Sequence, residues 1–247
     1  MRCRAALFTL GLVLFLAGCG KSPDLIVIGS KNFTEQVVLG ELLAQYIESH
    51  TSLRVERRFN LGGTYICHDA VRSGGIDLYV GYSGTALTAI LKEKPSSNPD
   101  DVYQRAKVAY RSRFDLEVTR PLGFNNSFAM VVRGADARRL KLETISDVAR
   151  FAPRWHAAFG YEFMERPDGF RGLADTYHLK FAGEPRIMEL GLLYRALLEK
   201  QADMVAGSAT DGAIAANDFV VLRDDKHYFP PYDAVPIVGG ATLERHL

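Results

Sequence analysis

The sequence predicts an α/β fold in which short strands alternate with helices in two successive segments. The first observation is a run of apolar strands separated by amphipathic helices between about residues 25 and 90, the pattern of a parallel sheet with crossover helices. The second is a change of character at residues 121–132, after which strands and helices alternate again. The third is the length of 247 residues, which is enough for two lobes of ordinary size.

The first segment contains three apolar runs that predict strands and four stretches that predict helices. The expected strands, rich in β-branched and apolar residues, are residues 25–29, 55–61 and 76–80. The expected helices are residues 33–49, 65–73, 86–91, and one that opens at 96–101 and runs to about 113. Asn32 is predicted to be the N-cap of the first helix, with Glu35 three residues later in a variant of the capping box.

The second segment repeats this alternation after the polar pair Asn125-Asn126. Strands are expected at residues 128–132, 157–161, 203–206 and 219–222, and helices at 145–151 and 192–200. In the last of these helices Leu193, Ala196 and Leu197 share the inward face. We therefore expect the chain to cross between segments near 121–126 and to return near 213–219.

The rest of the chain is organised around residues 75–87, where a strand runs through glycines into a helix that begins near Ala86. Free backbone N–H groups and the positive end of the helix dipole face such a turn, and this arrangement suits an anion. The same turn carries the ring of Tyr82 and the hydroxyls of Ser83 and Thr85. The alternative is an ordinary α/β connection with a packed tyrosine.

Residues 1–18 have the features of a signal peptide. Arg2 and Arg4 precede an apolar run that is shorter than the roughly 20 residues needed to span a bilayer. The sequence Leu-Ala-Gly-Cys at residues 16–19 looks like a bacterial lipobox, in which the cysteine is lipidated and begins the mature chain. We therefore predict a lipid anchor at Cys19 and a location in the periplasm or cell envelope, attached to the membrane.

Composition excludes several classes of protein. A hydrophobic content of 47% and a charged content of 24% are those of a soluble globular protein, and a net charge of +1 gives no reason to expect nucleic-acid binding. With Cys3 in the signal and Cys19 lipidated, Cys67 remains alone, so no disulfide framework is expected. The six histidines show no pair at ligand spacing, and we predict neither a metal nor a cofactor.

Several collinear motifs resemble one family, the substrate-binding proteins of ABC importers for glycine betaine, choline, carnitine and related quaternary amines. The resemblance runs from Ile26 to Pro236. The motifs that carry it are Gly-Ser-Lys-Asn-Phe-Thr-Glu-Gln at 29–36, Leu-Gly-Gly-Thr at 61–64, Asp-Leu-Tyr at 77–79 with Tyr-Ser-Gly-Thr at 82–85, Gly-Phe-Asn-Asn-Ser-Phe at 123–128, Arg-Pro-Asp-Gly at 166–169, Thr-Asp-Gly at 210–212, and residues 224–232 with Phe-Pro-Pro-Tyr at their end.

The resemblance implies a two-lobed periplasmic-binding-protein fold of type II, with a ligand cleft between lobes joined by two hinge strands. Such proteins are standard cases of hinge closure around a ligand. Lobe 1 would comprise residues 19–124 and 219–247, and lobe 2 residues 125–218. The implied partners are a small quaternary amine and the permease and ATPase subunits of an ABC importer.

The resemblance also assigns site residues. A quaternary ammonium has no N–H to donate, so ring faces and negative potential must hold it, at up to about 2 kcal/mol per desolvated cation–π contact. A ligand carboxylate needs Arg or Lys and oriented donors. The family's carboxylate partners fall on Lys31, Thr85 and Arg166, its aromatic cage falls on Tyr82, Phe128, Ser208 and Tyr232, and Asn126 falls beside the cation.

The sequence departs from the family in two places. At Ser208 the cage ring is absent, which predicts either weaker binding of a small trimethylammonium or a different ligand. The candidates are a bulkier betaine such as ergothioneine or carnitine, or an unmethylated amino acid. The chain also stops at Leu247, where members usually continue through further helices, so either it is truncated or its first lobe is smaller.

Two other classes of function stay open. An enzyme would use Ser208 or Ser83 as nucleophile and His227 or His68 as base, but the sequence has no Gly-x-Ser-x-Gly elbow and no evident nucleophile–base–acid set. We therefore predict that the protein is not an enzyme. A ligand-sensing domain of the envelope that feeds no transporter is the remaining alternative, and a neighbouring permease and ATPase gene would decide against it.

Overall fold

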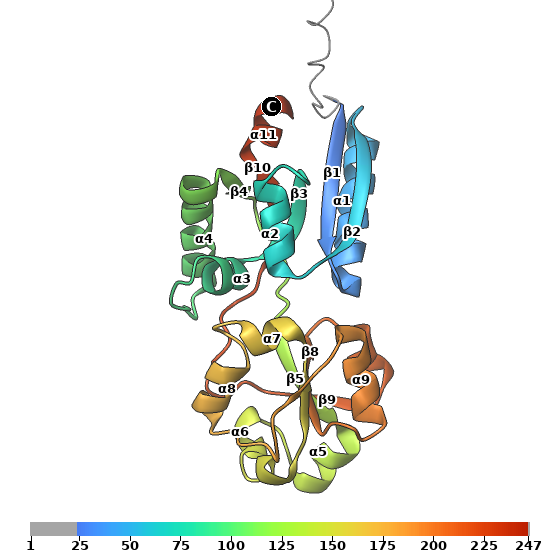
Figure 1. The fold of residues 1–247 in the computed structure, drawn as a ribbon, viewed down its shortest axis with the longest axis vertical. Coiled ribbons are helices and arrows are strands. Elements are labelled where there is room, and N and C mark those ends of the chain that lie inside the picture. The colour runs from blue at the N-terminus through green and yellow to red at the C-terminus, as the bar shows by residue number, and fades with distance from the viewer. Residues whose placement is uncertain (1–23, 247) are drawn as a thin grey trace, which may run out of the picture.

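The computed structural model describes residues 24–246 and contains two α/β lobes, one above the other (Figure 1). Each lobe is built on a mixed five-stranded sheet, so the predicted α/β class and division into two segments are confirmed. The predicted signal at residues 1–18 and the lipid anchor at Cys19 lie outside the described residues. No helix within residues 24–246 is both long enough and apolar enough to cross a membrane.

The sheet of lobe 1 has the strand order β2-β1-β3-β10-β4. Strand β1 (Leu25–Lys31) pairs in parallel with β2 (Arg54–Gly62) and β3 (Leu78–Tyr82). Strand β10 (Ala234–Gly239) lies antiparallel between β3 and β4 (Leu116–Val118). β4 and β10 were not among the expected strands, and β10 contains Pro236, a residue that argues against a central strand in a sequence.

The helices of lobe 1 cover both faces of this sheet. They are α1 (Thr34–His50), α2 (Thr64–Arg72), α3 (Ser83–Thr85) with the π-helix η1 (Ala86–Ile90), α4 (Pro99–Phe114) and α11 (Gly240–His246). The start of α4 is capped by the Asn98 side chain, which accepts from the N–H groups of Asp100 and Asp101. Asn32, by contrast, is not the N-cap of α1: the cap is Phe33, and it makes no side-chain capping bond.

The sheet of lobe 2 has the order β7-β6-β8-β5-β9. Its strands are β5 (Phe128–Arg133), β6 (Ala157–Phe159), β7 (Arg186–Ile187), β8 (Met204–Ser208) and β9 (Phe219–Leu222). Its helices are α5 (Gly134–Leu140), α6 (Ile145–Val148), the 3-10 turn η2 (Ala152–Arg154), α7 (Tyr161–Glu165), α8 (Phe170–Tyr177), α9 (Leu190–Leu198) and α10 (Gly212–Ala216). As expected, Leu193, Ala196 and Leu197 of α9 are buried against the sheet.

The return to lobe 1 comes later in the chain than the sequence suggested. Residues 219–222 were expected in lobe 1, but β9 pairs antiparallel with β5 and so belongs to lobe 2. The two connections instead form a short antiparallel ribbon, in which the Ala234 N–H donates to Phe124 O and the Asn126 N–H donates to Tyr232 O. The two crossings are visible between the lobes in Figure 1. The sheet pairing of β9 thus moves the second hinge to residues 232–234.

Candidate functional site

Lys31 and Tyr82 lie side by side at the edge of the lobe 1 sheet that faces lobe 2. Each is the last residue of a parallel strand, β1 and β3 respectively, and parallel neighbours end at the same edge. The Lys31 ammonium lies 4.8 Å from the centroid of the Tyr82 ring, and 3% of Lys31 is exposed. Burial lowers the pKa of Lys31 from 10.5 to about 8. Within residues 24–246 this ammonium has no hydrogen bond and no ion pair.

On the opposite side, lobe 2 contributes a buried ion pair from the loop between α7 and α8. Arg166 Nε lies 2.8 Å from Asp168 Oδ1, and Arg166 Nη2 lies 2.6 Å from Asp168 Oδ2. Burial alone would raise the pKa of Asp168, but the Arg166 guanidinium and the hydrogen bonds outweigh it and hold that pKa below its usual value. The structure therefore contains the ion pair between Arg166 and Asp168, which is the alternative to a ligand role for this arginine.

The ion pair of lobe 2 is joined to lobe 1 by two threonine hydroxyls. Arg166 Nη2 donates to Thr85 Oγ1 at 3.2 Å, and the Thr88 hydroxyl donates to Asp168 Oδ2 at 2.7 Å. Thr88 lies in the π-helix η1, a rare form that occurs often at functional sites. The glycine turn before it allows close approach, since a Cβ on Gly84 would press on Pro231 O and lie 2.8 Å from Tyr232 Cδ1.

Phe128 and Tyr232 form an aromatic corner against this ion pair. Their ring centroids are 5.7 Å apart with the planes nearly perpendicular, at 81°. The Arg166 guanidinium carbon lies 5.0 Å from the Phe128 centroid and 5.8 Å from the Tyr232 centroid, and the Tyr232 hydroxyl donates to Asp168 at 2.6 Å. Burial raises the pKa of Tyr232, so this phenol stays protonated. Positive groups thus lie against the faces of all three aromatic residues assigned from the sequence.

Glu35 is a residue of the lobe interface to which the sequence analysis gave a different role. It was expected to cap α1, but its Oε1 accepts from the Tyr82 hydroxyl and, at 2.8 Å, from Asn126 Nδ2. Its Oε2 accepts from the Thr210 hydroxyl of lobe 2. Burial, followed by the Glu35 charge, raises the pKa of Tyr82 far above its ordinary value. The signal in the sequence was the position of Glu35 in the same strand-to-helix motif as Lys31.

Ser208 lies opposite Phe128 in the antiparallel pair of β5 and β8. It is half-buried, and its backbone N–H donates to Asp211 Oδ2 at 3.0 Å. Thr210, the lobe 2 partner of Glu35, follows it in the same turn. The position without a ring is therefore half-buried and lies in the same turn as the lobe 2 partner of Glu35.

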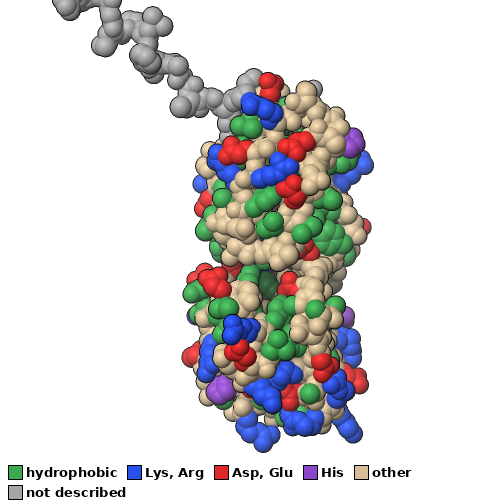
Figure 2. All heavy atoms as spheres, turned by 90° about the vertical axis from the view of Figure 1, so that its right-hand side faces the viewer, with side chains coloured by type: hydrophobic (Ala, Val, Ile, Leu, Met, Phe, Trp, Pro, Cys, Tyr) green, Lys and Arg blue, Asp and Glu red, His purple; other side chains and the backbone are tan. Residues whose placement is uncertain are grey.

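A further contact closes the lobes beside Lys31. Glu162 at the start of α7 accepts from the backbone N–H of Thr64 and, at 3.0 Å, from its hydroxyl, and it lies 4.0 Å from Arg166. Contacts through Glu35, Thr64, Thr85 and Thr88 therefore hold the two lobes together in a closed arrangement. Figure 2 shows the lobes meeting at a waist, with positive and negative side chains interspersed on both.

The groups considered for catalysis or metal binding are not brought together. Ser83 donates to Pro231 O at 3.3 Å, while His68 lies in the core of lobe 1 between the rings of Tyr110 and Phe114. His227 lies in the turn after β9, where its N–H donates to Asp224 O. Within residues 24–246, no cluster of three or more His, Cys, Asp or Glu side chains could hold a metal ion.

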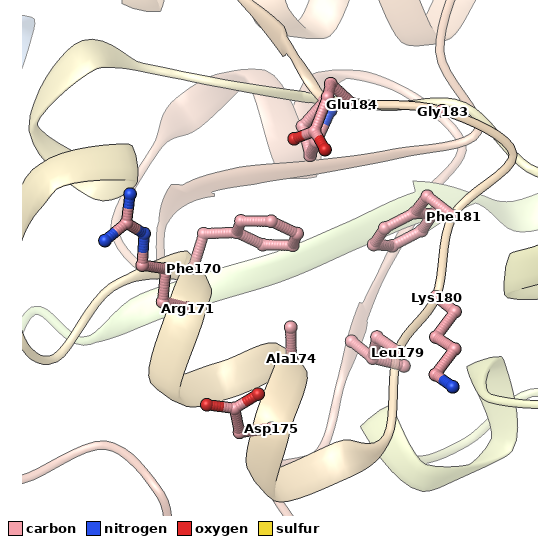
Figure 3. Close-up of a pocket in the computed structure, with 10 residues that line it drawn as sticks. Phe170, Arg171, Ala174, Asp175, Leu179, Lys180, Phe181, Gly183 and Glu184 are labelled. Carbon is pink, nitrogen blue, oxygen red and sulfur yellow. The ribbon is translucent and has the colours of Figure 1, made fainter.

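Lobe 2 also carries a hollow of about 470 Å³ on α8 and the segment that follows it. Figure 3 shows its facing rings, Phe170 and Phe181, whose centroids are 6.2 Å apart, with the charged side chains of Arg171, Asp175 and Lys180 around them. Its lining residues all fall between 170 and 185. It includes none of the residues assigned from the sequence and belongs to lobe 2 alone.

Comparison with known proteins places this arrangement in a family. The model of the OpuAC family, described as the substrate-binding domain of an ABC-type glycine betaine transport system, matches residues 24–247. A carnitine transport binding protein of Listeria monocytogenes is 33% identical over 98% of this chain and 82% of its own length. A glycine-betaine-binding protein of Pseudomonas aeruginosa is 32% identical over 94% of this chain and 77% of its own length.

Solved structures agree with this placement. A crystal structure described as a glycine betaine/carnitine/choline ABC transporter is 32% identical, superposes with a TM-score of 0.71, and covers 90% of this chain and 82% of its own. The two-lobed fold expected from the resemblance is therefore confirmed, and the family consists of transport binding proteins rather than enzymes. The chain belongs to the OpuAC family of substrate-binding domains, the extracytoplasmic components of ABC importers.

Proposed function

We propose that this protein captures glycine betaine or a related quaternary amine between its lobes and delivers it to an ABC permease. The observation that carries the proposal is the Lys31 ammonium, which is buried at the lobe interface beside the Tyr82 ring and has no carboxylate within 4 Å among residues 24–246. A buried unpaired cation is costly. A carboxylate on the ligand would remove that cost.

The ligand carboxylate is expected to bind Lys31, with Thr85 and Arg166 as further donors. Arg166 already shares its charge with Asp168, so Lys31 supplies the net positive charge that an anion would meet. Thr85 Oγ1 accepts from Arg166, and its own hydroxyl proton remains for a ligand oxygen.

The quaternary ammonium is expected to bind the rings of Tyr82, Phe128 and Tyr232, next to Asn126 and Ser208. The positions of Lys31 and Arg166 over these rings support this, because the same ring potential that attracts them attracts a ligand cation. Each ring is also held in place: the Tyr82 and Tyr232 hydroxyls donate to Glu35 and Asp168 respectively, and Phe128 packs on Phe163.

Delivery requires the protein to remain near a permease. The lipobox motif ending at Cys19 supports a lipid anchor on the periplasmic or outer face of the membrane, and the permease and ATPase of an importer are the expected partners. Fractionation of cells that produce the Cys19→Ala variant tests the anchor: retention of this variant in the membrane fraction would contradict it.

Thermal-shift titration of the purified protein with glycine betaine, carnitine, choline and ergothioneine tests the binding proposal. We expect at least one of these ligands to raise the melting temperature, and the Lys31→Met variant to lose the response to those with a carboxylate. Lys107→Met is the control for loss of a lysine away from the lobe interface, because Lys107 lies on α4, over the Tyr103 ring and 3.4 Å from Glu117. No response to any methylated amine at millimolar concentration would reject the proposal.

The Ser208→Tyr variant distinguishes the ligand classes. If the site takes a small trimethylammonium, a ring opposite Phe128 completes the cage and tightens binding of glycine betaine. If it takes a bulkier betaine, the same ring occupies space that the ligand needs, and affinity for carnitine or ergothioneine falls instead.

A further inference from the structure

Glu35 stands out among the charged groups at the lobe interface because it has three neutral hydrogen-bond donors and no ion pair among the described residues. Its carboxylate accepts from the Tyr82 hydroxyl, the Asn126 amide and the Thr210 hydroxyl. Within residues 24–246 it has no ion pair closer than 4.0 Å. It is also half-buried, so its charge is only partly screened by water.

The other charges at the interface are largely accounted for. Arg166 is paired with Asp168 at 2.6 Å, and Glu162 lies 4.0 Å from Arg166. This leaves one cation and one anion, Lys31 and Glu35, at two ends of the same ring: Lys31 lies over the face of Tyr82, and Glu35 accepts from its hydroxyl. A ligand with a carboxylate and a fixed positive charge would compensate both.

We propose that Glu35 is the counter-charge for the cationic end of the ligand and determines specificity for positively charged nitrogen. This inference rests on the proposed function of the same site. Glu35 contacts Thr210, which lies two residues after Ser208, so its negative charge meets the same turn that carries the position where the fourth ring is missing. A full charge attracts even an ammonium that offers no N–H, because Coulomb attraction does not require a hydrogen bond.

The same contacts connect ligand charge to lobe closure. Glu35 is on α1 of lobe 1, Asn126 is in the first hinge segment, and Thr210 is in lobe 2. A ligand cation between the lobes would attract Glu35 toward lobe 2, where the Thr210 hydroxyl already donates to it. The closed arrangement is therefore favoured more by a cationic ligand than by a neutral one of the same shape.

A pair of isosteric ligands isolates this effect. Glycine betaine and 3,3-dimethylbutanoate have the same carboxylate and nearly the same shape, but the second has a carbon in place of the charged nitrogen. Calorimetric titration gives the ratio of their dissociation constants for the wild type and for Glu35→Gln. The amide can keep all three hydrogen bonds of Glu35, since the Thr210 hydroxyl can accept as well as donate.

We expect the preference of the wild type for glycine betaine to fall about tenfold or more in Glu35→Gln. Glu41→Gln is the control: Glu41 lies on the same helix and pairs with Arg57 on the surface, and its ratio should match the wild type. Thr210→Val should weaken both ligands by the same factor, because it removes an interlobe contact but no charge. Should Glu35→Gln fail to fold, Glu35→Asp keeps the charge and should keep most of the preference.

Two results would separate the possible errors. If the ratio of the two dissociation constants in Glu35→Gln equals that of the wild type, Glu35 has only a structural role. Binding of glycine betaine by the wild type would then leave the proposed function intact. If the wild type binds no quaternary amine at all, the proposed function itself is wrong.

Discussion

Replacement of Lys31 by Met is predicted to stabilise the unliganded protein while removing its affinity for carboxylate ligands. In the folded state burial lowers the pKa of Lys31 from its usual 10.5 to about 8. This difference corresponds to about 3 kcal/mol at neutral pH, because one unit of pKa is about 1.36 kcal/mol. The charged Lys31 therefore lowers the stability of the folded state by about that order, and Met has a similar length without the charge.

The pH dependence follows from the same shift. Between pH 8 and 10.5 the unfolded chain still carries the Lys31 proton and the folded chain has released it, so the free energy of unfolding rises with pH across this window. Below about pH 8 the penalty is constant. A ligand carboxylate favours the protonated amine, so affinity for glycine betaine is predicted to fall as pH rises above about 8, whereas affinity for choline, which has no carboxylate, is not.

Urea denaturation at pH 7 and pH 10, with and without glycine betaine, measures each part of this prediction. We expect Lys31→Met to be more stable than the wild type at pH 7 by about 2–3 kcal/mol, allowing for relaxation around the charge, and to match it more closely at pH 10. Lys107→Met should show neither effect. A Lys31→Met protein that is no more stable at pH 7, together with wild-type affinity for glycine betaine that is constant from pH 7 to 9.5, would refute the reasoning.

Three further predictions concern other parts of the site and the core. Asp168→Asn leaves the buried Arg166 without its partner and should lower the free energy of unfolding by about 3 kcal/mol, measured by chemical denaturation; a loss below 1 kcal/mol would show that water compensates the arginine. Gly84→Ala places a Cβ against Pro231 O and 2.8 Å from the Tyr232 ring, so ligand affinity should fall at least tenfold by calorimetry, whereas Gly183→Ala, with open space around it, should bind normally. Burial lowers the pKa of His68 below 6.5, so stability should decline as pH falls through 6.5; this decline, followed by melting temperature from pH 7.5 to 5, should be smaller in His68→Phe, and equal declines would contradict it.

The approach of Lys31 to Tyr82 is the part of the site that follows most directly from sequence. Both residues end a strand in the pattern of a parallel sheet, and the ends of parallel strands share an edge. The glycine turn after Tyr82 likewise requires only local reasoning, since Gly84 lies between a strand and a helix. The expected strands ended at residues 29 and 80, and the structure extends them to Lys31 and Tyr82, so local periodicity located both strand ends to within two residues.

The assignment of Glu35 shows where local reasoning fails. A glutamate three residues after Asn32 matches a capping pattern, yet α1 begins at Thr34 without a side-chain cap. The alternative partners of this carboxylate are Tyr82, Asn126 and Thr210, up to 175 residues away in sequence. The three hydrogen bonds that these residues donate to Glu35 together outweigh one local capping hydrogen bond, which contributes only about 1 kcal/mol.

The α/β class, the two segments and the family were accessible from sequence, together with some of the side chains that meet between the lobes, such as Thr85 and Arg166. Tertiary contacts were needed to show that β9 belongs to lobe 2 and that β10, despite Pro236, lies inside the first sheet between β3 and β4. The physical reason is that strand pairing and ion pairing between distant residues depend on which partners remain available after the chain has crossed twice between lobes. Periodicity indicates which face of a helix or strand is buried, but it does not identify the element against which that face packs.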